Sequence, residues 1–384
     1  MNKTILPGAT IGMVGGGQLG RMFAIAAAQM GYRVVIFCHD AQSPAAQVTG
    51  SAVVAEMDDH EAVDRFAKQC DVITLEFENI SADTIARCSR FAPTYPAASV
   101  LATAQDRAVE KSTLRDAGLP VTPFVEISNS DELSTAAEQL GWPMIVKTCR
   151  SGYDGKGQYR VSSPGDADQV AWDTTDRWVA EKFIPFQCEI SVIVARTADG
   201  RSKCFPVFEN DHRNHVLDVS ISPPSIDAAL ADQAASIAIR AAETLGVVGL
   251  LCVEMFVITD ESDGNTTLVI NEVAPRPHNS GHLTIEACLT SQFEQHVRAI
   301  CGLPLGETDL VAGAAAMANL LGDVWTPNEP PPWDSALAIK GVRLHLYGKA
   351  TPKAGRKMGH LTATAATASE AKERVVSARN ALRR

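Results

Sequence analysis

The sequence predicts a mixed fold with a doubly wound parallel α/β unit at the amino end, a small α+β unit in the middle and a mostly antiparallel unit at the carboxyl end. Three observations favour it. The first hundred residues alternate β-rich runs with amphipathic segments, residues 91–96 are rich in turn formers and interrupt that alternation, and two later β-runs read as a hairpin. A chain of 384 residues is long enough for two or three compact units. We place them at 1–105, 106–185 and 186–384.

The amino-terminal unit shows the alternation most clearly. Strands are expected at 10–14, 33–38, 51–55 and 71–75, and helices at 18–30 and 60–70. A further helical segment at 106–117 is closed by Gly118 and Pro120, which are typical helix-ending residues.

The remaining elements follow from the same patterns. In the middle unit we expect a helix at 131–140, strands at 144–147, 158–161 and 178–182, and a glycine loop at 151–157. In the carboxyl unit we expect strands at 189–196 and 204–209, a helix at 226–245 and a hairpin of 250–258 and 267–272. The Ala/Thr-rich stretch 362–371 is expected to be a loop that leads into the last helix.

Composition excludes several classes of protein. The chain is 46% hydrophobic and 21% charged, which is typical of a globular protein, and its net charge of −11 argues against nucleic-acid binding. The nine cysteines form no Cys-x-x-Cys pair and are interpreted as buried thiols of a reducing compartment. Without a signal-peptide pattern or a run of about 18 apolar residues, we expect a cytoplasmic protein that does not bind membranes.

The glycine string Gly15–Gly20 allows two interpretations. It satisfies G-x-G-x-x-G between a strand and a helix, and Asp40 follows at the spacing of a dinucleotide fold. However, the amides and dipole of a helix amino terminus bind any phosphate, including that of a sugar phosphate. A dehydrogenase does not require the second glycine loop and the acidic strand positions found later in the chain, so the sugar phosphate is favoured.

A lysine and a glycine loop indicate a polyphosphate site. Lys147 ends an apolar strand and is followed by 151–157, so a fixed cation lies beside a segment rich in backbone amides. A strand-end lysine that extends to solvent is the alternative, and it does not account for the loop. Glu181 ends a later strand, and its carboxylate is a candidate acceptor for a ribose hydroxyl, as is that of Glu189.

Two strand glutamates indicate a magnesium site. Counting outward from the turn 260–264 places Glu254 and Glu272 near one another on antiparallel strands. Two neighbouring carboxylates repel unless a cation lies between them, and Mg²⁺ prefers oxygen ligands. The alternative, two surface glutamates on a hairpin, does not explain why both interrupt strongly apolar strands.

Together these elements resemble the ATP-grasp superfamily, and the resemblance spans almost the whole chain. It implies an ATP-grasp fold in which the middle unit is a lid and ATP lies between it and a catalytic carboxyl-terminal domain. Five strings resemble, more narrowly, the N5-carboxyaminoimidazole ribonucleotide synthetase family: GGGQLGRM at 15–22, TLEFENI at 74–80, SGYDGKGQ at 151–158, NEVAPRPHNSGH at 271–282 and GRKMGHL at 355–361.

The narrower resemblance implies a ligase that uses ATP, Mg²⁺ and bicarbonate to carboxylate 5-aminoimidazole ribonucleotide, as a homodimer. The ATP-binding residues it implies are Arg107, Lys147, Gly152, Tyr153, Asp154, Gly155, Lys156, Gly157, Gln158, Glu181, Lys182, Phe183, Ile184, Glu189, His212, Asn271 and Glu272. The substrate-binding residues it implies are Gly17, Gln18, Leu19, Glu76, Ser151, Tyr153, Arg276, His278, Asn279, Lys349 and Arg356. The metal ligands are Glu254 and Glu272. His215 matches no family position and is interpreted as incidental.

Three residues are candidates for the chemistry itself. Arg276 is placed to stabilise an oxyanion, and Tyr153 and Asp154 are candidate base and proton relay because closure of their loop delivers them together. Other ATP-grasp enzymes, such as a formate-using transformylase or a biotin carboxylase, remain alternatives, although the strings at 76–80 and 355–361 favour the imidazole substrate. A nucleotide-sensing module is the alternative outside enzymes, but it needs neither two metal carboxylates nor a base.

Overall fold

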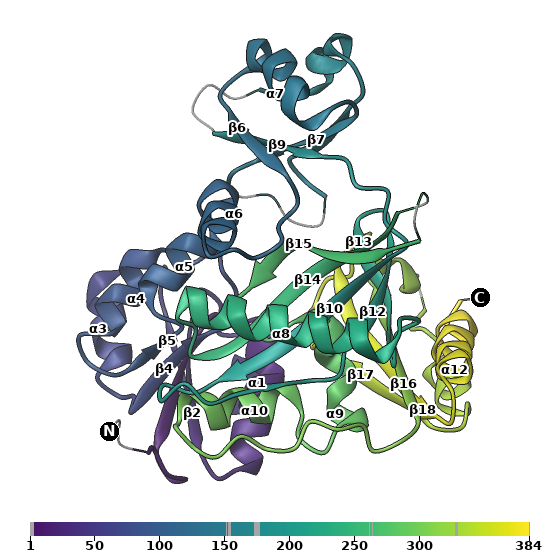
Figure 1. The fold of residues 1–384 in the computed structure, drawn as a ribbon. Coiled ribbons are helices and arrows are strands. Elements are labelled where there is room, and N and C mark those ends of the chain that lie inside the picture. The colour runs from purple at the N-terminus through teal and green to yellow at the C-terminus, as the bar shows by residue number, and fades with distance from the viewer. Residues whose placement is uncertain are drawn as a thin grey trace.

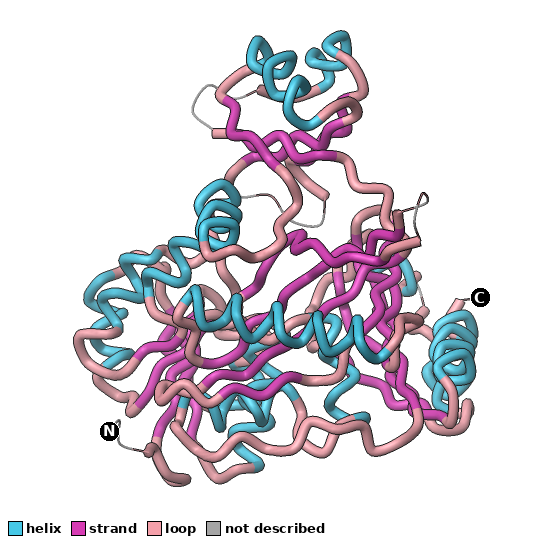
Figure 2. The backbone as a smooth tube through the Cα atoms, viewed as in Figure 1, coloured by secondary structure: helices cyan, strands magenta, loops and turns pink. Residues whose placement is uncertain are grey.

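The computed structural model of the chain describes residues 4–150, 152, 155–172, 177–260, 262, 264–326 and 329–383. Within this part the strands form a parallel sheet, a small antiparallel sheet and a large antiparallel sheet. Figure 1 shows the small sheet, with helix α7 (Leu133–Leu140) beside it, projecting from the body that the other two sheets form. The same view by element type in Figure 2 shows helices along the outside of that body.

The parallel sheet is buried on both sides. Its strands lie in the order β3-β2-β1-β4-β5, and apolar residues pack with α1 on one face and with α3 and α4 on the other. The strands are β1 (Thr10–Val14), β2 (Arg33–Cys38), β3 (Ala52–Val54), β4 (Val72–Leu75) and β5 (Thr94–Tyr95). The helices are α1 (Gln18–Gln29), α2 (Ala46–Thr49), α3 (His60–Ala67), α4 (Ala82–Cys88) and α5 (Ala98–Ala104).

The small sheet follows helix α6 (Arg107–Asp116), which begins where the Asp106 side chain accepts a hydrogen bond from the Val109 amide. Its order is β6-β9-β7-β8, with antiparallel pairs throughout. The strands are β6 (Phe124–Ile127), β7 (Met144–Thr148), β8 (Gln158–Val161) and β9 (Trp178–Lys182), and single 3₁₀ turns cover Ser130–Glu132 and Pro164–Gln169. The segment between α6 and β6 is tied to the large sheet, since the Thr122 amide donates to the Ile270 carbonyl at 3.0 Å.

The large sheet has the order β15-β14-β10-β12-β13-β16-β18-β17, with β11 paired to β10. Its strands are β10 (Cys188–Arg196), β11 (Ser202–Cys204), β12 (Phe208–Arg213), β13 (Val216–Ser222), β14 (Gly249–Thr259), β15 (Thr266–Ala274), β16 (Ala314–Leu321), β17 (Val342–Leu346) and β18 (Lys357–Ala365). Its helices are α8 (Ala228–Leu245), α9 (Thr284–Ala287), α10 (Gln292–Ile300), α11 (Trp333–Leu337) and α12 (Ala368–Ala381), with 3₁₀ turns η3 (Asn279–Leu283) and η4 (Gly322–Val324).

Strand alternation gives the central strands of this sheet two different faces. Val192 and Val253 point to the face that α8 covers, where they form an apolar core. Figure 1 shows α8 lying across β10 and β14. Because side chains alternate along a strand, their neighbours Ser191 and Glu254 point to the opposite face.

A β-bulge interrupts the pairing of β14 with β15. Glu254 pairs with Glu272 but Met255 pairs with Ile270, so Asn271 is the extra residue. The bulge lets Ile270 and Val273 both join the core under α8, although they are three positions apart and strict alternation would put them on opposite faces. Glu272, which lies between them, therefore shares the face of Glu254.

The predicted elements agree with the structure in most places and differ in two. The run 204–209 was expected to be one strand, but β11 ends at Cys204 and β12 begins at Phe208, because Pro206 lacks the amide that a ladder needs. The Ala/Thr-rich stretch 362–371 was expected to be a loop, which is wrong. Thr362–Ala365 ends β18, and Ala368 begins α12.

Among the described residues, no helix has the length and apolar character needed to cross a bilayer.

Candidate active site

A cavity of about 970 Å³ is lined by residues of all three units. Most of the predicted ligand-binding residues line it: Gln18, Leu19, Arg107, Lys147, Gly152, Gly155, Lys156, Gly157, Gln158, Glu181, Lys182, Phe183, Ile184, Glu189, His212, Glu254, Asn271, Glu272, Arg276, His278 and Asn279. Three predicted residues, Ser151, Tyr153 and Asp154, lie outside the described part of the chain. The cavity is therefore the candidate active site.

The floor of the cavity carries the two predicted metal carboxylates. Glu254 and Glu272 are direct partners across β14 and β15, which confirms that they lie near one another. The Glu272 side chain is 46% exposed, and Arg107 Nη2 lies 4.0 Å from its Oε2. Burial opposes ionisation of Glu254, but His278, with Nε2 2.9 Å from Oε1, outweighs it and lowers the pKa of Glu254 to about 2.

The wall formed by the small sheet carries a buried ion cluster. Lys147 Nζ donates to Glu181 Oε2 at 2.9 Å, and Lys111 Nζ lies 3.3 Å from Oε1. Burial opposes ionisation of Glu181, but Lys111 and Lys147 together lower its pKa to about 2. The carboxylate that was predicted to accept from a ribose hydroxyl is thus 2% exposed and accepts from lysine instead. Lys111 also donates to the Asn271 carbonyl at 2.7 Å, which links α6, the small sheet and β15.

Glu189 and His212 form a second acidic contact beside the floor. His212 Nδ1 lies 2.9 Å from Glu189 Oε2, although the two groups are poorly aligned for a hydrogen bond. Burial opposes protonation of His212, but the carboxylates of Glu189, Glu254 and Glu272 outweigh it and raise the pKa of this imidazole. Because Glu189 lines the cavity and has no lysine partner among the described contacts, it remains the better candidate for a ribose hydroxyl.

Arg276 is held in a bidentate pair with Glu78. Its Nη2 donates to Glu78 Oε1 at 2.8 Å, Nε donates to Oε2, and Nη1 donates to the Pro277 carbonyl at 3.2 Å. Burial opposes ionisation of Glu78, but Arg276 lowers its pKa to about 2. A guanidinium has five donors, so one N–H on each Nη is left for a ligand. Glu78 was not singled out from the sequence, although it lies in the string at 74–80.

Amides of the glycine string, which were expected to bind a phosphate, donate to a carboxylate of the protein instead. Glu76, which follows β4, accepts from the Gly20 amide at 2.9 Å and from the Gly17 amide. A Cβ on Gly17 would lie 2.7 Å from Glu76 Oε1, which explains the absence of a side chain there. The structure therefore corrects two assignments. Gly17 donates to Glu76 rather than to the open cavity, and Glu76 is 6% exposed, so it presents no free carboxylate to a ribose.

Lys349 and Arg356 belong to the turn between β17 and β18, as the predicted hairpin required. Lys349 Nζ donates to the Lys357 carbonyl at 2.7 Å, and Arg356 Nη1 donates to the Thr351 carbonyl at 2.8 Å. Neither residue lines the cavity as described. Burial raises the pKa of Glu76, and the nearby charge of Lys349 opposes this rise, which places this turn beside the glycine string.

The glycine loop is attached at both ends of its described part. Arg107 Nη2 donates to the Gly152 carbonyl at 2.9 Å, and its Nη1 donates to the Thr148 carbonyl at 3.3 Å. At Gly155, φ is +78° and an added Cβ would lie 2.5 Å from His215 Cβ. His215 lines the cavity, so its interpretation as incidental is corrected: it packs against the loop.

Sequence reasoning missed further residues of the cavity. Glu110 of α6 lines it while only 3% exposed, and its Oε1 has no hydrogen-bond partner. Burial raises the pKa of Glu110 to about 8, despite Lys111 beside it. Phe186 and Phe256 stack with ring centres 4.6 Å apart at the cavity edge. The only available signal for Glu110 was an acidic residue within an amphipathic helix, which surface helices also show.

Three protein-family models match the chain. Residues 112–293 match the ATP-grasp domain, residues 8–105 the ribonucleotide synthetase preATP-grasp domain, and residues 315–374 the phosphoribosylaminoimidazole carboxylase C-terminal domain. The chain is 42% identical to the N5-carboxyaminoimidazole ribonucleotide synthase of Bacillus subtilis over 364 residues, which cover 94% of this chain and 93% of that protein.

The chain belongs to the N5-carboxyaminoimidazole ribonucleotide synthase family. It is thus an ATP-dependent ligase with an ATP-grasp fold, as the motifs predicted. Within the longer bifunctional purine synthesis protein purC/E of Dictyostelium discoideum, 41% identical, it spans 37% of the length.

Solved structures of the family agree with the fold. The ADP complex of an N5-carboxyaminoimidazole ribonucleotide synthetase is 42% identical, with a TM-score of 0.90 and 98% of both chains covered. The synthase of Aspergillus clavatus, solved with ADP and 5-aminoimidazole ribonucleotide, is 31% identical, with a TM-score of 0.88 and 97% of this chain and 98% of that chain covered.

Proposed function

We propose that the chain carboxylates the exocyclic amine of 5-aminoimidazole ribonucleotide, using ATP and bicarbonate, to give N5-carboxyaminoimidazole ribonucleotide. The observation that carries the proposal is the direct pairing of Glu254 with Glu272 on the floor of the cavity that Lys147 and the glycine loop border. The bound ADP and 5-aminoimidazole ribonucleotide of the Aspergillus relative support the same pair of ligands here.

The residues of the floor fit Mg²⁺. Glu254 and Glu272 offer carboxylate oxygens on one face of adjacent strands, and Glu272 is open to the cavity. When bound there with ATP, Mg²⁺ supplies positive charge to the phosphate oxygens. Asn271, which the bulge places beside them, is a further oxygen donor at the cavity edge.

The proposed reaction balances in three steps. A bicarbonate oxygen attacks the γ-phosphorus of ATP, and the bond to the β-phosphate oxygen breaks, which gives carboxyphosphate and ADP. Carboxyphosphate then breaks its C–O bond to give CO₂ and phosphate. The amine nitrogen attacks CO₂, forms the carbamate C–N bond and loses one proton. Carboxyphosphate is short-lived in water, so the glycine loop must close before it forms.

Cations of the wall and the loop stabilise the transferred phosphoryl group. Lys147 borders the cavity from β7, and Arg107 lies between the glycine loop and Glu272. In phosphoryl transfer most of the catalysis is such positioning and charge stabilisation. Arg276, fixed by Glu78, directs its remaining donors at a developing oxyanion.

The amine proton passes to Asp154 with Tyr153 as relay. Support for this assignment is the position of both residues in the glycine loop. An Asp154→Asn enzyme then keeps its ATP affinity and carboxylates about 10² to 10⁴ times more slowly, the usual range for a lost general base.

The nucleotide substrate is held between the amino-terminal unit and the carboxyl end. The amides of Gln18 and Leu19, with Lys349 and Arg356 of the nearby turn, provide donors for its phosphate. Ser151 and Asn279 complete the substrate contacts that the family resemblance implies, whereas His278, which the resemblance also implies, faces Glu254.

Release of ADP tests the function. We expect ADP only when ATP, Mg²⁺ and 5-aminoimidazole ribonucleotide are present with bicarbonate, and carbamate formation in proportion to it. Turnover with formate or biotin in place of the imidazole ribonucleotide would identify a different ATP-grasp enzyme. Binding of ATP with no turnover under any of these conditions would identify a sensing module. A thermal shift with NADH but not with ATP and Mg²⁺ would revive the dehydrogenase.

The assembly proposed is a cytoplasmic homodimer, as the resemblance implies. Light scattering on the purified 40.9 kDa chain checks it, with a mass near twice that value expected.

A further inference from the structure

A row of buried polar side chains crosses the large sheet beneath the cavity floor. Ser220 of β13 donates to Asn210 Oδ1 at 2.7 Å, and Asn210 Nδ2 donates to Ser191 Oγ at 2.9 Å. Ser191 Oγ in turn donates to Ser280 Oγ at 2.8 Å. All four residues are 5% exposed or less, so their hydrogen bonds are protected from water. The row ends at His278, whose Nδ1 lies 2.9 Å from Ser280 Oγ.

The direction of the last bond is fixed by the backbone. The Ser280 amide donates to His278 Nδ1 at 3.3 Å, and an amide N–H cannot accept. The Ser280 hydroxyl already accepts from Ser191, so its own proton points to the same nitrogen. With donors facing it from both sides, Nδ1 carries no proton.

We infer that the row holds His278 in the tautomer with its proton on Nε2, and that this N–H positions Glu254 for the cation. His278 Nε2 lies 2.9 Å from Glu254 Oε1. The contact orients the carboxylate and leaves Oε2 for Mg²⁺. Outer partners of this kind commonly orient the carboxylates that bind metals. His278 is then a positioning residue that acts through Glu254, a role that deepens and rests on the proposed function.

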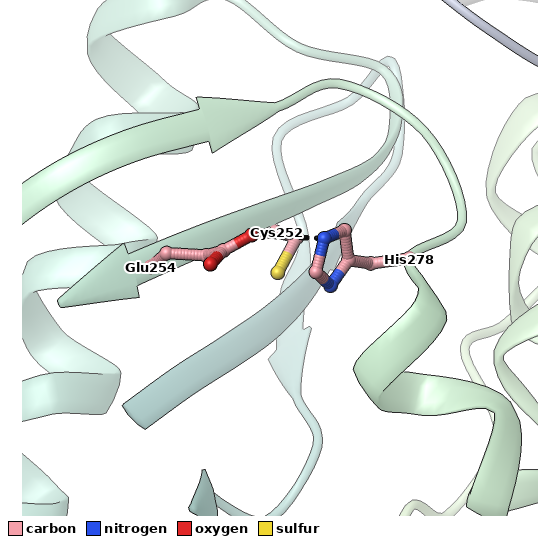
Figure 3. Close-up of side chains that lie close together, drawn as sticks. All are labelled: Cys252, Glu254 and His278. Atoms are coloured by element: carbon pink, nitrogen blue, oxygen red, sulfur yellow. Dashed lines mark ion pairs between the residues drawn. The ribbon is translucent and has the colours of Figure 1, made fainter. Parts of the chain in front are cut away.

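The same tautomer explains why a second group of possible metal ligands, close to the first, does not form a metal site. Cys252, Glu254 and His278 have ligand atoms within 4.8 Å of one another, and Figure 3 shows the thiol between the carboxylate and the imidazole. A thiol, a carboxylate and an imidazole suit a softer ion such as Zn²⁺. However, an Nε2 that carries a proton offers no lone pair to a metal.

Nitrogen NMR of the full-length protein labelled with ¹⁵N-histidine tests the tautomer without any assay of activity. We expect the His278 ring, identified by the signals that His278→Gln removes, to show a protonated Nε2 and an unprotonated Nδ1. A protonated Nδ1 would overturn the inference, and so would Zn²⁺ binding that shifts these signals and is lost in Cys252→Ala.

Magnesium titrations test the role. In His278→Leu the Mg²⁺ concentration for half-maximal activity should rise about 10- to 100-fold, as for other lost outer partners. His278→Gln keeps an N–H donor, so the Mg²⁺ concentration that it needs for half-maximal activity should stay within about threefold of that of the unchanged enzyme. If His278 contacts the imidazole ribonucleotide instead, His278→Leu raises the KM for that substrate and leaves the Mg²⁺ requirement unchanged, which overturns the inference.

A matched pair of serine variants separates the row from general packing. Ser280→Ala removes one hydrogen bond to His278 and should raise the Mg²⁺ requirement about fivefold. Ser222 is equally buried but donates to the Val207 carbonyl outside the row, so Ser222→Ala should leave that requirement unchanged. Equal effects of both variants would count against the row. Failure of the unchanged enzyme to turn over would sink the proposed function alone, because the tautomer is read independently.

Discussion

The carboxylates on the wall and on the floor of the cavity have opposite environments. On the wall, Glu181 lies between Lys111 and Lys147 and is 2% exposed. On the floor, Glu272 has a 46% exposed side chain and its described cation partner, Arg107, is 4.0 Å away. A carboxylate balanced within the protein holds the units together, whereas one left open to the cavity attracts a cation that arrives with a ligand. Exposure and partner distance therefore separate architecture from function better than residue type does.

Removing the floor charge gives the largest expected effect. Glu272→Gln should lower turnover roughly 10³-fold or more, because a preorganised charge at the metal is lost, with unchanged thermal unfolding. Steady-state rates across a Mg²⁺ series measure it. Glu243→Gln, on the exposed side of α8, is the control. Unaltered dependence on Mg²⁺ in Glu272→Gln would defeat the metal assignment.

Removing a balancing charge from the wall should instead cost stability. Lys111→Met leaves Glu181 with one lysine and removes the hydrogen bond to the Asn271 carbonyl, so the free energy of unfolding should fall by about 3 to 5 kcal/mol. Urea unfolding measures it. The exposed Lys340→Met is the matched control. A loss of activity with unchanged stability would mean that Lys111 serves the ligand.

Lys147 belongs to both regions, because it pairs with Glu181 and borders the cavity. Lys147→Ala should raise the ATP requirement or slow phosphoryl transfer by roughly 10²-fold. The KM for ATP and the single-turnover rate measure the two possibilities separately. Normal kinetics accompanied by weaker folding would assign Lys147 wholly to the wall.

The smallest expected effect concerns Glu110, whose buried Oε1 has no hydrogen-bond partner. Burial raises its pKa from 4.5 to about 8, so between these values the folded protein holds a proton that the unfolded chain releases. Stability from this group is complete below pH 4.5 and is lost as pH rises toward 8, by at most about 1.4 kcal/mol per pH unit. Glu110→Gln should remove that slope in urea unfolding at pH 5.5 and 7.5. Parallel curves for the variant and the unchanged protein would show that Glu110 is ionised at both pH values.

Local patterns were sufficient to predict many of the elements. β8 and β9 have the predicted bounds because apolar runs bordered by turns read as strands in any context. The Ala/Thr-rich end of β18 was missed because its alanines have little strand preference of their own. They fit there because Ala314, Ala315 and Ala316 of β16, equally small, pair with Ala365, Thr364 and Ala363, and α12 covers both strands.

The site was predictable as far as its motifs extend. Strand patterns and their spacing gave Glu254, Glu272 and Lys147, since their chemistry is tied to position along the chain. The inward turn of Glu76 onto Gly17 depends on how the ends of β1 and β4 meet, and Lys111 acts on a strand 70 residues away, so neither contact has a local signal. These contacts required the tertiary structure.

The bulge at Asn271 makes the register of β15, as well as residue identity, decide whether this protein has an acidic floor. If strict alternation continued from Ile270 without the bulge, Asn271 would stand opposite Glu254. Glu272 would then fall on the side of Leu268 and Ile270, against α8. The sequence would be unchanged, yet the second carboxylate would be buried in the apolar core rather than offered to a cation.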